Sequence, residues 1–443
     1  MRRRHLLSGP LAALGAGAAG ALGLAACGGQ EAASPAAGQE RATVRVVTRT
    51  SYDPGAWQVV SEQDERANVR VETEVGESDT APYGRKILAL AAADSLPDLI
   101  YVHPNFFSSV ASKKLLVDHE KVAAQQMFDL KGIQKELVDS VRWTDGKLYA
   151  VPYSGVSYLL IVNVGLFRQR GVAPPLELEK QGKWNWEGFR AALQQLTLRQ
   201  PGQPPIVGMP EHARGLQYLS HWIFGNGGEV WSKDLRTCLL DSPRTREALE
   251  YVAGLHARDR VTVQPDELEQ FGVTSLQRGF ESGRVGVYFR ATTEVNQVRA
   301  MAERGAELGV APVPRGPVAR TPRGAGNAWG VTAQSKVPEA AFRALAAWHR
   351  DPVLEHLYQQ RYMFPCRQTQ FDHPAFKAAL FPWEDLEVER TALREVRIMA
   401  TPDRFTEIDE QWNRMWRDAL YGQKSVGEVL NEFLPQANAL LAG

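Results

Sequence analysis

Short apolar runs and one amphipathic stretch alternate over the first part of the chain. Residues 43–48 are β-branched with partial alternation and residues 98–102 form a compact apolar run, so both segments predict strands. Between them, residues 83–93 place Ile, Leu and Ala at helical spacing, and Leu96-Pro97 ends that helix. Strand, helix and strand in this order are typical of a parallel α/β sheet.

A second α/β stretch follows the first. An Asp145-Gly146 pair lies between two apolar runs and predicts a hairpin over residues 142–152. Residues 158–162 and 284–289 predict two more buried strands, and residues 184–196 predict an amphipathic helix.

Glycine and proline gather between Arg315 and Gly326, which makes this stretch the best candidate for an internal linker. An apolar segment at residues 329–332 and a helix at residues 339–348 follow it. From about residue 376 to the C-terminus the apolar spacing is helical. The pattern therefore predicts an α/β protein with a helical C-terminal closure.

Composition narrows the class of protein. Of 443 residues, 44% are hydrophobic and 23% charged, which excludes wholesale disorder, a collagen-like fibre and a polytopic membrane protein. The length predicts two or three cores. Basic and acidic residues balance at 51 each, so the charge does not indicate a nucleic acid partner. Three cysteines exclude a disulfide-stapled scaffold.

The N-terminus reads as an export signal. Arg2, Arg3 and Arg4 precede an uncharged run that ends in Leu24-Ala25-Ala26-Cys27, so residues 1–26 are expected to be a signal peptide. The alternative is a membrane anchor helix, which a Gly/Ala-rich run containing a proline would make weak.

The last residues of that run resemble the lipobox of bacterial lipoproteins, in which the cysteine is acylated and becomes the new N-terminus. Cys27 is then the lipidation site, and residues 27–41 are a flexible tether. The adjacent arginines also resemble a twin-arginine signal, so export by the Sec or the twin-arginine route is expected. The mature protein would be anchored to the cell membrane, outside the cytoplasm.

No motif of catalysis or metal binding is complete. His119-Glu120 lacks the second histidine of a zinc metalloprotease helix, and a P-loop and a nucleophile elbow are missing. His349 and His356 could share a helix face only if Pro352 does not break the helix. The sequence therefore predicts neither an enzyme nor a metal or other cofactor.

Seven segments in order resemble the family 1 extracellular solute-binding proteins, the sugar-capturing subunits of bacterial ABC importers. Each motif is weak alone, and their order carries the resemblance. They are the small-residue helix and Pro-Asp strand at residues 87–99, the D-G-K-x-Y-x-x-P hairpin at 145–152, residues 163–171, the tryptophan-led helix start at 184–189, residues 283–287, residues 310–314, and residues 335–341; the helix around residues 425–430 is similar to the family's C-terminal closure.

The resemblance implies a two-lobed, class II periplasmic-binding-protein-like fold, with the ligand clamped between two α/β lobes. The chain would cross the hinge three times, near Ser154-Gly155, within residues 321–326 and after Tyr362. Lobe I would then comprise residues 42–153 and 326–362, and lobe II residues 154–325 and 363–443.

Candidate ligand contacts follow from the same resemblance, because a sugar needs planar hydrogen-bonding groups at its edge and an aromatic plate on its face. The candidates are His103, Asn105, Tyr153, Ser154, Gln217, Arg290, Trp329 and Arg367. Each has a structural alternative: Asn105 could form a turn, Trp329 could be a core residue, and either arginine could pair with an acid in the other lobe. Cys238 and Cys366 could be bridged or free.

Three functions stay open at this point. The first is a monomeric binding protein that delivers a mono- or oligosaccharide to the transmembrane subunits of an ABC permease. The second is a binder of the same fold for a polyamine, a phosphodiester or a metal complex. The third is an extracytoplasmic glycan-cleaving enzyme, which would show turnover rather than stoichiometric binding.

Overall fold

The computed structural model describes residues 41–49, 53–77, 79–122, 129–210, 215–267, 276–291, 298–361 and 363–442. The expected signal peptide, Cys27 and nearly all of the expected tether lie outside these residues. Within them, no helix has both the length and the apolar character that a membrane span requires.

A mixed seven-stranded sheet runs through the described chain in the order β2-β1-β3-β7-β4-β5, with β6 paired to β4. Its first three strands are parallel, and β7 and β4 continue it antiparallel. The α/β prediction is confirmed. The strands are β1 (Ala42–Arg49), β2 (Val69–Gly76), β3 (Leu99–Val102), β4 (Val151–Asn163), β5 (Val287–Ala291), β6 (Leu308–Ala311) and β7 (Gly324–Val331).

Strand β4 links two parts of the sheet. Its first half, residues 151–157, pairs with β7, and its second half pairs with β5 and β6. The segment that we expected to be a linker up to Gly326 is therefore partly strand, since β7 begins at Gly324. Gly155 allows a close approach at the middle of β4, because a Cβ there would lie 2.6 Å from the carbonyl oxygen of Pro365.

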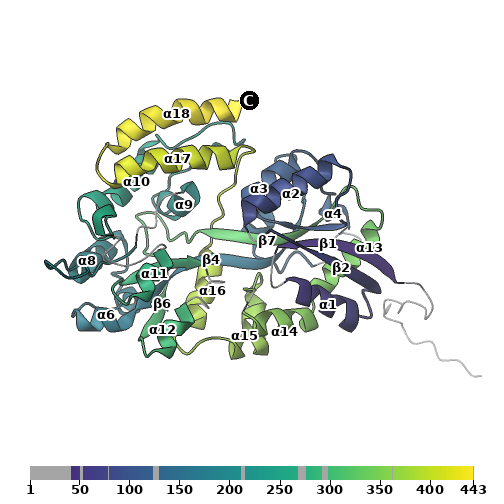
Figure 1. Cartoon of the computed structure of the whole chain (residues 1–443), viewed down its shortest axis with the longest axis horizontal. Helices are drawn as coiled ribbons and strands as arrows, with labels where there is room; N and C mark the ends of the chain where they lie inside the picture. The colour runs from purple at the N-terminus through teal and green to yellow at the C-terminus, as the bar shows by residue number, and fades with distance from the viewer. Residues whose placement is uncertain are drawn as a thin grey trace, which may run out of the picture. The chain divides into compact units, whose positions relative to one another are not determined.

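The first hydrophobic core surrounds β1, β2, β3 and β7. Large aromatic side chains fill it, with Trp57, Trp329 and Trp348 among the fully buried ones. Helices cover this part of the sheet in Figure 1. They are α1 (Asp53–Gln63), α2 (Thr80–Ala92), α3 (Pro104–Ala111), α4 (His119–Val122), α5 (Lys135–Asp139), α13 (Pro338–Trp348) and α14 (Asp351–Gln359).

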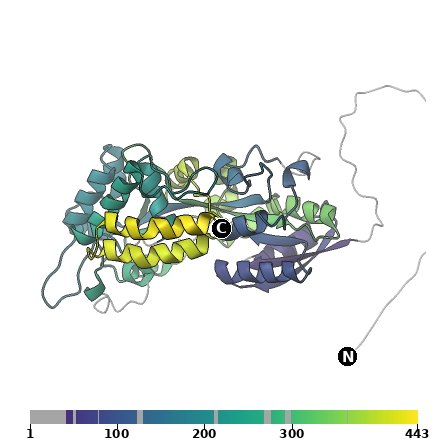
Figure 2. The ribbon, with the colours of Figure 1, turned by 90° about the horizontal axis from the view of Figure 1, so that it is seen from above.

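The second core packs helices against one face of β4, β5 and β6, and a smaller apolar cluster around Phe280 and Tyr288 covers the other face. Trp412 and Trp416 are fully buried in the second core. The C-terminal pair α17 and α18 lies side by side in Figures 1 and 2. The helices of this part are α6 (Val164–Gln169), α7 (Pro175–Lys180), α8 (Trp186–Leu196), α9 (Leu216–Gly225), α10 (Pro243–Ala257), α17 (Phe405–Leu420) and α18 (Val426–Ala442), and the smaller cluster includes side chains of α11 (Leu276–Glu281) and α12 (Arg299–Glu303).

The segment after residue 362 packs largely on the first core. Met363, Phe364 and Phe371 belong to the first core, and so do Leu393 and Val396. This segment carries α15 (Pro374–Ala378) and α16 (Leu386–Glu395). From Met399 onward, the buried apolar side chains of the chain belong to the second core.

Two local predictions have a mixed outcome. The Asp145-Gly146 turn is present, with Gly146 at φ +80° and the Trp143 amide donating to the Lys147 carbonyl over 3.0 Å, but the flanking pairing is an isolated bridge. Cys238 and Cys366 are both free, and they lie buried in different cores. Burial raises the pKa of each thiol to about 12.

Candidate functional site

Two short polar segments meet where the cores adjoin. The first starts α3, where the His103 Nδ1 accepts a hydrogen bond from the Asn105 amide over 3.1 Å and Pro104 occupies the first turn. The second starts α9, where the Leu216 amide donates to Asp409 Oδ1 over 2.8 Å. Both caps fix the side chain that follows them at a helix start.

The amide of Gln217 joins the two segments. Its Nε2 donates to Asn105 Oδ1 over 2.5 Å, and its Oε1 accepts from Arg323 Nη2 over 2.7 Å. Arg323 directly precedes β7, one of the two strands that connect the cores. Gln217, on helix α9 beside the second core, therefore links the start of α3 beside the first core with the start of the connecting strand β7.

Arg323 is buried in an unusual environment. Only 8% of its surface is exposed, and its guanidinium carbon lies 4.3 Å from the ring centroid of Tyr158 and 4.4 Å from that of Tyr218. Its Nη1 is buried without a hydrogen-bond partner among the described residues. Burial alone lowers the pKa of Arg323, but the two tyrosines raise it above its ordinary value, so the side chain is charged.

A second arginine lies at the end of β1. Arg49 Nη1 donates to the Tyr101 hydroxyl over 3.3 Å, and that hydroxyl donates to Asn327 Oδ1 over 2.7 Å. We call the whole set the junction cluster: Arg49, Tyr101, His103, Asn105, Tyr158, Gln217, Tyr218, Arg323 and Asn327.

Two histidines at the junction stay neutral. His103 is half-buried by surface area, yet the desolvation of its ring, with Arg49 and Arg323 nearby, lowers its pKa to about 3. Burial, followed by the charge of Arg323, also lowers the pKa of His221 to about 3. At neutral pH both rings therefore offer hydrogen bonds without charge.

Of the eight predicted site residues, the structure brings three together: His103, Asn105 and Gln217. Trp329 is fully buried in the first core, 5.0 Å from the ring of Trp57 and 5.2 Å from that of Trp348, and Tyr153 stacks on it at 5.7 Å. This packing favours the core interpretation of Trp329 and removes Tyr153 from the junction. Ser154 is buried too, and its Oγ accepts from the Phe364 amide over 3.2 Å.

The other two candidate arginines lie away from the cluster. Arg290 is on β5, where its Nη1 donates to Tyr288 Oη over 3.0 Å on the face of the smaller cluster. Tyr158, paired with the neighbouring Ala291, points to the opposite face because side chains alternate along a strand. Arg367 donates to the Asp129 carbonyl over 2.6 Å and lies 3.8 Å from the Asp129 carboxylate. Arg367 thus pairs with an acid, and the neighbouring Ile133 and Cys366 belong to the first core, so this pair lies within one part of the protein and not between two lobes.

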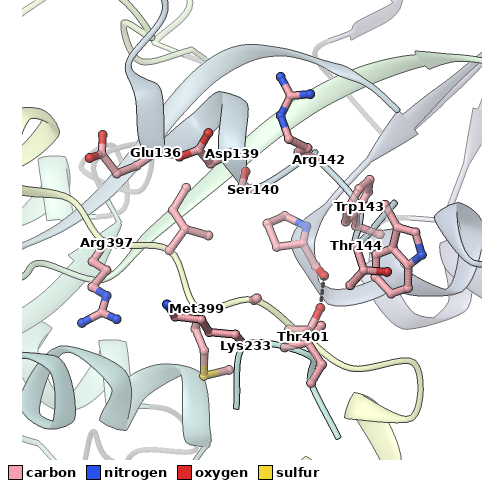
Figure 3. A pocket seen from close by; sticks show the side chains of 15 residues that line it. Glu136, Asp139, Ser140, Arg142, Trp143, Thr144, Lys233, Arg397, Met399 and Thr401 are labelled. Carbon is pink, nitrogen blue, oxygen red and sulfur yellow. Dashed lines mark hydrogen bonds between the residues drawn. The ribbon is translucent and has the colours of Figure 1, made fainter. Parts of the chain in front are cut away.

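A separate groove of about 430 Å³ opens beside the chain segment 397–401 (Figure 3). Glu136, Asp139 and Arg142 line it from one side, and Lys233 and Arg397 from the other. Two of its cations already have acidic partners, since Arg142 bonds Glu120 and Arg397 bonds Glu229 over 2.7 and 2.6 Å. The groove does not include the junction cluster, which is the stronger candidate site because it holds a buried guanidinium with an unused donor.

The sequence reasoning missed several members of the junction cluster. Arg49 was detectable, because it ends a predicted strand and ligands collect at strand ends in open α/β sheets. Arg323 was concealed within a stretch that read only as a linker. Tyr158 and Tyr218 had no distinguishing signal, since a tyrosine in a strand or a helix is ordinary.

The cluster is equipped for binding. Its members offer amides, hydroxyls, aromatic faces and cations, which can hold a polar solute. Among the described residues no three His, Cys, Asp or Glu side chains group as metal ligands.

Comparisons with known proteins agree on one kind of protein. The family model described as bacterial extracellular solute-binding protein matches residues 49–348. A search of curated proteins gives no match. The chain is similar in structure to the ABC substrate-binding protein of Listeria monocytogenes in complex with cycloalternan, with a TM-score of 0.75 and 18% identity over 91% of this chain and 99% of that one.

Two further solved structures are similar. The GacH receptor of Streptomyces glaucescens, solved unliganded and with acarbose, has a TM-score of 0.71 and 19% identity over 91% of this chain and 99% of that one. The sugar-binding protein MalE of Xanthomonas citri has a TM-score of 0.75 and 17% identity over 90% of this chain and 97% of that one. At these identities the likeness establishes the two-lobed periplasmic-binding-protein fold.

Proposed function

Because the chain belongs to the bacterial extracellular solute-binding protein family, we propose that it captures a sugar or oligosaccharide between two lobes and delivers it to the transmembrane subunits of an ABC importer. Lobe I would comprise residues 42–153 and 326–362, and lobe II residues 154–325 and the C-terminal part. The packing of residues 363–376, Leu393 and Val396 on the first core supports adding this segment to lobe I, with the third crossing at residues 397–401, although Phe381, Trp383 and Val388 pack on the smaller cluster of the second part.

The observation that carries the proposal is the hydrogen bond between Gln217 and Asn105, at 2.5 Å, with Tyr158 and Tyr218 beside it. Amides bind hydroxyl pairs at a sugar's edge, and tyrosine rings pack on its faces. A solute between the two helix starts would replace the direct amide contact with its own hydroxyls.

The membrane attachment is part of the proposal. The lipobox-like sequence before Cys27 supports a mature protein that is acylated there and held at the outer face of the cell membrane. We expect this protein to act as a monomer. Such a tether would keep the binding lobes close to the permease without fixing their orientation.

The chemistry of the cluster bears on the alternatives. A polyamine would meet the charge of Arg323, so a cationic solute is disfavoured. A phosphodiester would be compatible with that charge. A glycan-cleaving enzyme needs two carboxyl groups facing one another about 5 to 9.5 Å apart, and the junction cluster contains no carboxylate.

A thermal-shift screen of the protein against neutral and acidic sugars tests the proposal. A sugar present at 100 times its dissociation constant raises the free energy of unfolding by about 2.7 kcal/mol. Asn105→Ala should abolish most of the shift, whereas Gln203→Ala, at an exposed turn, should leave it unchanged. A screen in which no sugar stabilises the protein would contradict sugar capture.

A further inference from the structure

The surroundings of Arg323 indicate the chemical class of the sugar, an inference that rests on the proposed function. We propose that the captured saccharide is acidic, carrying a carboxylate or a phosphate, and that the guanidinium of Arg323 binds this anionic group. Neutral saccharides would then be poor ligands of the same site.

The first argument is the unused hydrogen-bonding capacity of a buried cation. Arg323 donates from Nη2 to Gln217 Oε1 and its guanidinium interacts with Tyr158 and Tyr218, whereas Nη1 has no well-aligned hydrogen-bond acceptor among the described residues. Leaving a buried charged donor unpaired is costly, and an oxygen anion is the partner that a guanidinium fork fits best. A bound carboxylate or phosphate would accept from this donor.

Comparison with two other buried arginines shows that Arg323 differs from them in lacking an acidic partner, not in having an unpartnered nitrogen. Arg320, three residues earlier, has a side chain that is 9% exposed and pairs with Glu179 at 2.5 Å and Glu395 at 3.8 Å. Arg361, also buried, has an unpartnered Nη1 too, but it pairs with Glu384. Among the described residues no carboxylate lies within ion-pair distance of Arg323, whose charge therefore lacks the compensation that these two arginines have.

Two arginines act on the same part of the site. Arg49 adds a second cation through Tyr101, and both Arg49 and Arg323 act on His103, which is neutral. The acid that acts on Arg323 is Asp409, and its oxygens already accept from the Leu216 amide and from Asn413 Nδ2 at 3.1 Å. Asp409 is thus already engaged and forms no ion pair with Arg323, so a ligand anion would be the partner that this guanidinium lacks among the described residues.

The two tyrosines determine how the anion could be held. Tyr158 and Tyr218 lie close to the guanidinium, with 6.1 Å between their own ring centroids, and so restrict its orientation. Tyr218 is 37% exposed, so one wall of this aromatic site is open to solvent. A sugar ring could pack on that wall while its acidic substituent contacts Arg323.

The test compares matched pairs of sugars on the full-length protein by thermal shift and calorimetric titration. Glucose is compared with glucuronate and with glucose 6-phosphate, galactose with galacturonate, and neutral with uronate-containing disaccharides. We expect the acidic member of at least one pair to bind at least tenfold more tightly than its neutral partner. The uronates test whether the site binds a carboxylate, and glucose 6-phosphate tests whether it binds a phosphate.

Variants connect the preference with the residue. Arg323→Gln should weaken binding of the acidic sugar by roughly tenfold to a hundredfold, the range expected for a lost charged hydrogen bond, and should remove most of the difference in affinity between the acidic sugar and its neutral partner. Arg323→Lys keeps the positive charge but loses the planar guanidinium, so its affinity for the acidic sugar should lie between those of the wild type and Arg323→Gln. Arg320→Gln is the matched control: it should lower the melting temperature but preserve the preference for the acidic sugar.

The outcomes distinguish this inference from the proposed function. If neutral sugars bind as tightly as acidic ones, or if Arg323→Gln keeps the acid preference, the acidic class is wrong although sugar capture stands. If no saccharide of either class binds, both are wrong. Binding of glycerophosphodiesters in place of acidic sugars would likewise overturn the saccharide class.

Discussion

Gln217 and Asn105 connect the two cores of the protein through one hydrogen bond, in which Gln217 Nε2 donates to Asn105 Oδ1 over 2.5 Å. The two residues are 112 positions apart and each follows a capped helix start. Because β4 and β7 connect the two cores, a hydrogen bond between residues beside each core depends on the distance between the cores. It is therefore the natural place to measure lobe closure.

Removing this hydrogen bond should shift the balance between open and closed forms. A neutral hydrogen bond contributes about 0.5 to 1.5 kcal/mol, so Gln217→Ala should change the ligand-free equilibrium by roughly 2- to 13-fold toward the open form. X-ray scattering of the ligand-free variant should give a larger radius of gyration than the wild type, with Gln203→Ala as control. An unchanged radius in Gln217→Ala, and no compaction of the wild type at saturating sugar, would contradict hinge closure.

Trp329 should matter for folding rather than for binding. Its ring is fully buried among Trp57, Trp348 and Tyr153. Truncating such a side chain costs about 3 to 5 kcal/mol, so Trp329→Ala should lower the free energy of unfolding by this amount, and Trp329→Phe by less. Denaturant unfolding measures the loss. A Trp329→Ala protein that keeps its stability and loses sugar affinity would restore the aromatic-plate interpretation.

The outcome for Trp329 illustrates what the sequence could and could not determine. The order of apolar runs was sufficient for the α/β class, because strand and helix periodicities differ. It could not distinguish a tryptophan facing a cleft from one facing a core, since both occur at the end of an apolar strand. In the same way, glycines around Arg323 read as a linker, although here they allow β7 to pack closely against its neighbours.

Helix starts were the more predictable part of the site. His103 and Asn105 follow a strand. The position of Asn105 depends on a local contact, the hydrogen bond that its own amide donates to the His103 ring two residues earlier. Arg323 acquires its role from tertiary contacts with Tyr158 and Tyr218, which are 165 and 105 positions away in the chain. No local pattern encodes such a contact, so this part of the site required the structure.

Lipidation at Cys27 gives a prediction that is independent of the ligand. The apolar run that ends in Leu24-Ala25-Ala26 should direct acylation of the following cysteine, and Cys27→Ser removes the sulfur that is acylated. The wild type should fractionate with membranes, and the variant should be released or remain unprocessed. Cys238→Ser is the control, because its thiol is buried in the second core. Normal processing and membrane association of Cys27→Ser would contradict a lipoprotein.

His119 should make the stability of the protein depend on pH. Its Nδ1 lies 2.8 Å from the Val117 carbonyl, to which it donates, and its Nε2 accepts from the Val331 amide over 2.9 Å. The second contact requires an unprotonated Nε2, hence a neutral ring. Burial lowers its pKa from 6.5 to about 4, although the Val117 carbonyl opposes the shift.

The sign of the effect follows from the two protonation states. Between pH 6.5 and 4 the unfolded chain binds a proton at this residue and the folded chain does not, so the free energy of unfolding falls as the pH is lowered through this window. The difference of about 2.5 pH units corresponds to about 3 kcal/mol. Denaturant unfolding at several pH values should show a shallower fall for His119→Gln than for the wild type. Phe342→Leu, which alters the ring packed on His119 at 5.1 Å, should lower stability by a similar amount at every pH. Equal slopes for His119→Gln and the wild type would show that this histidine does not carry the effect.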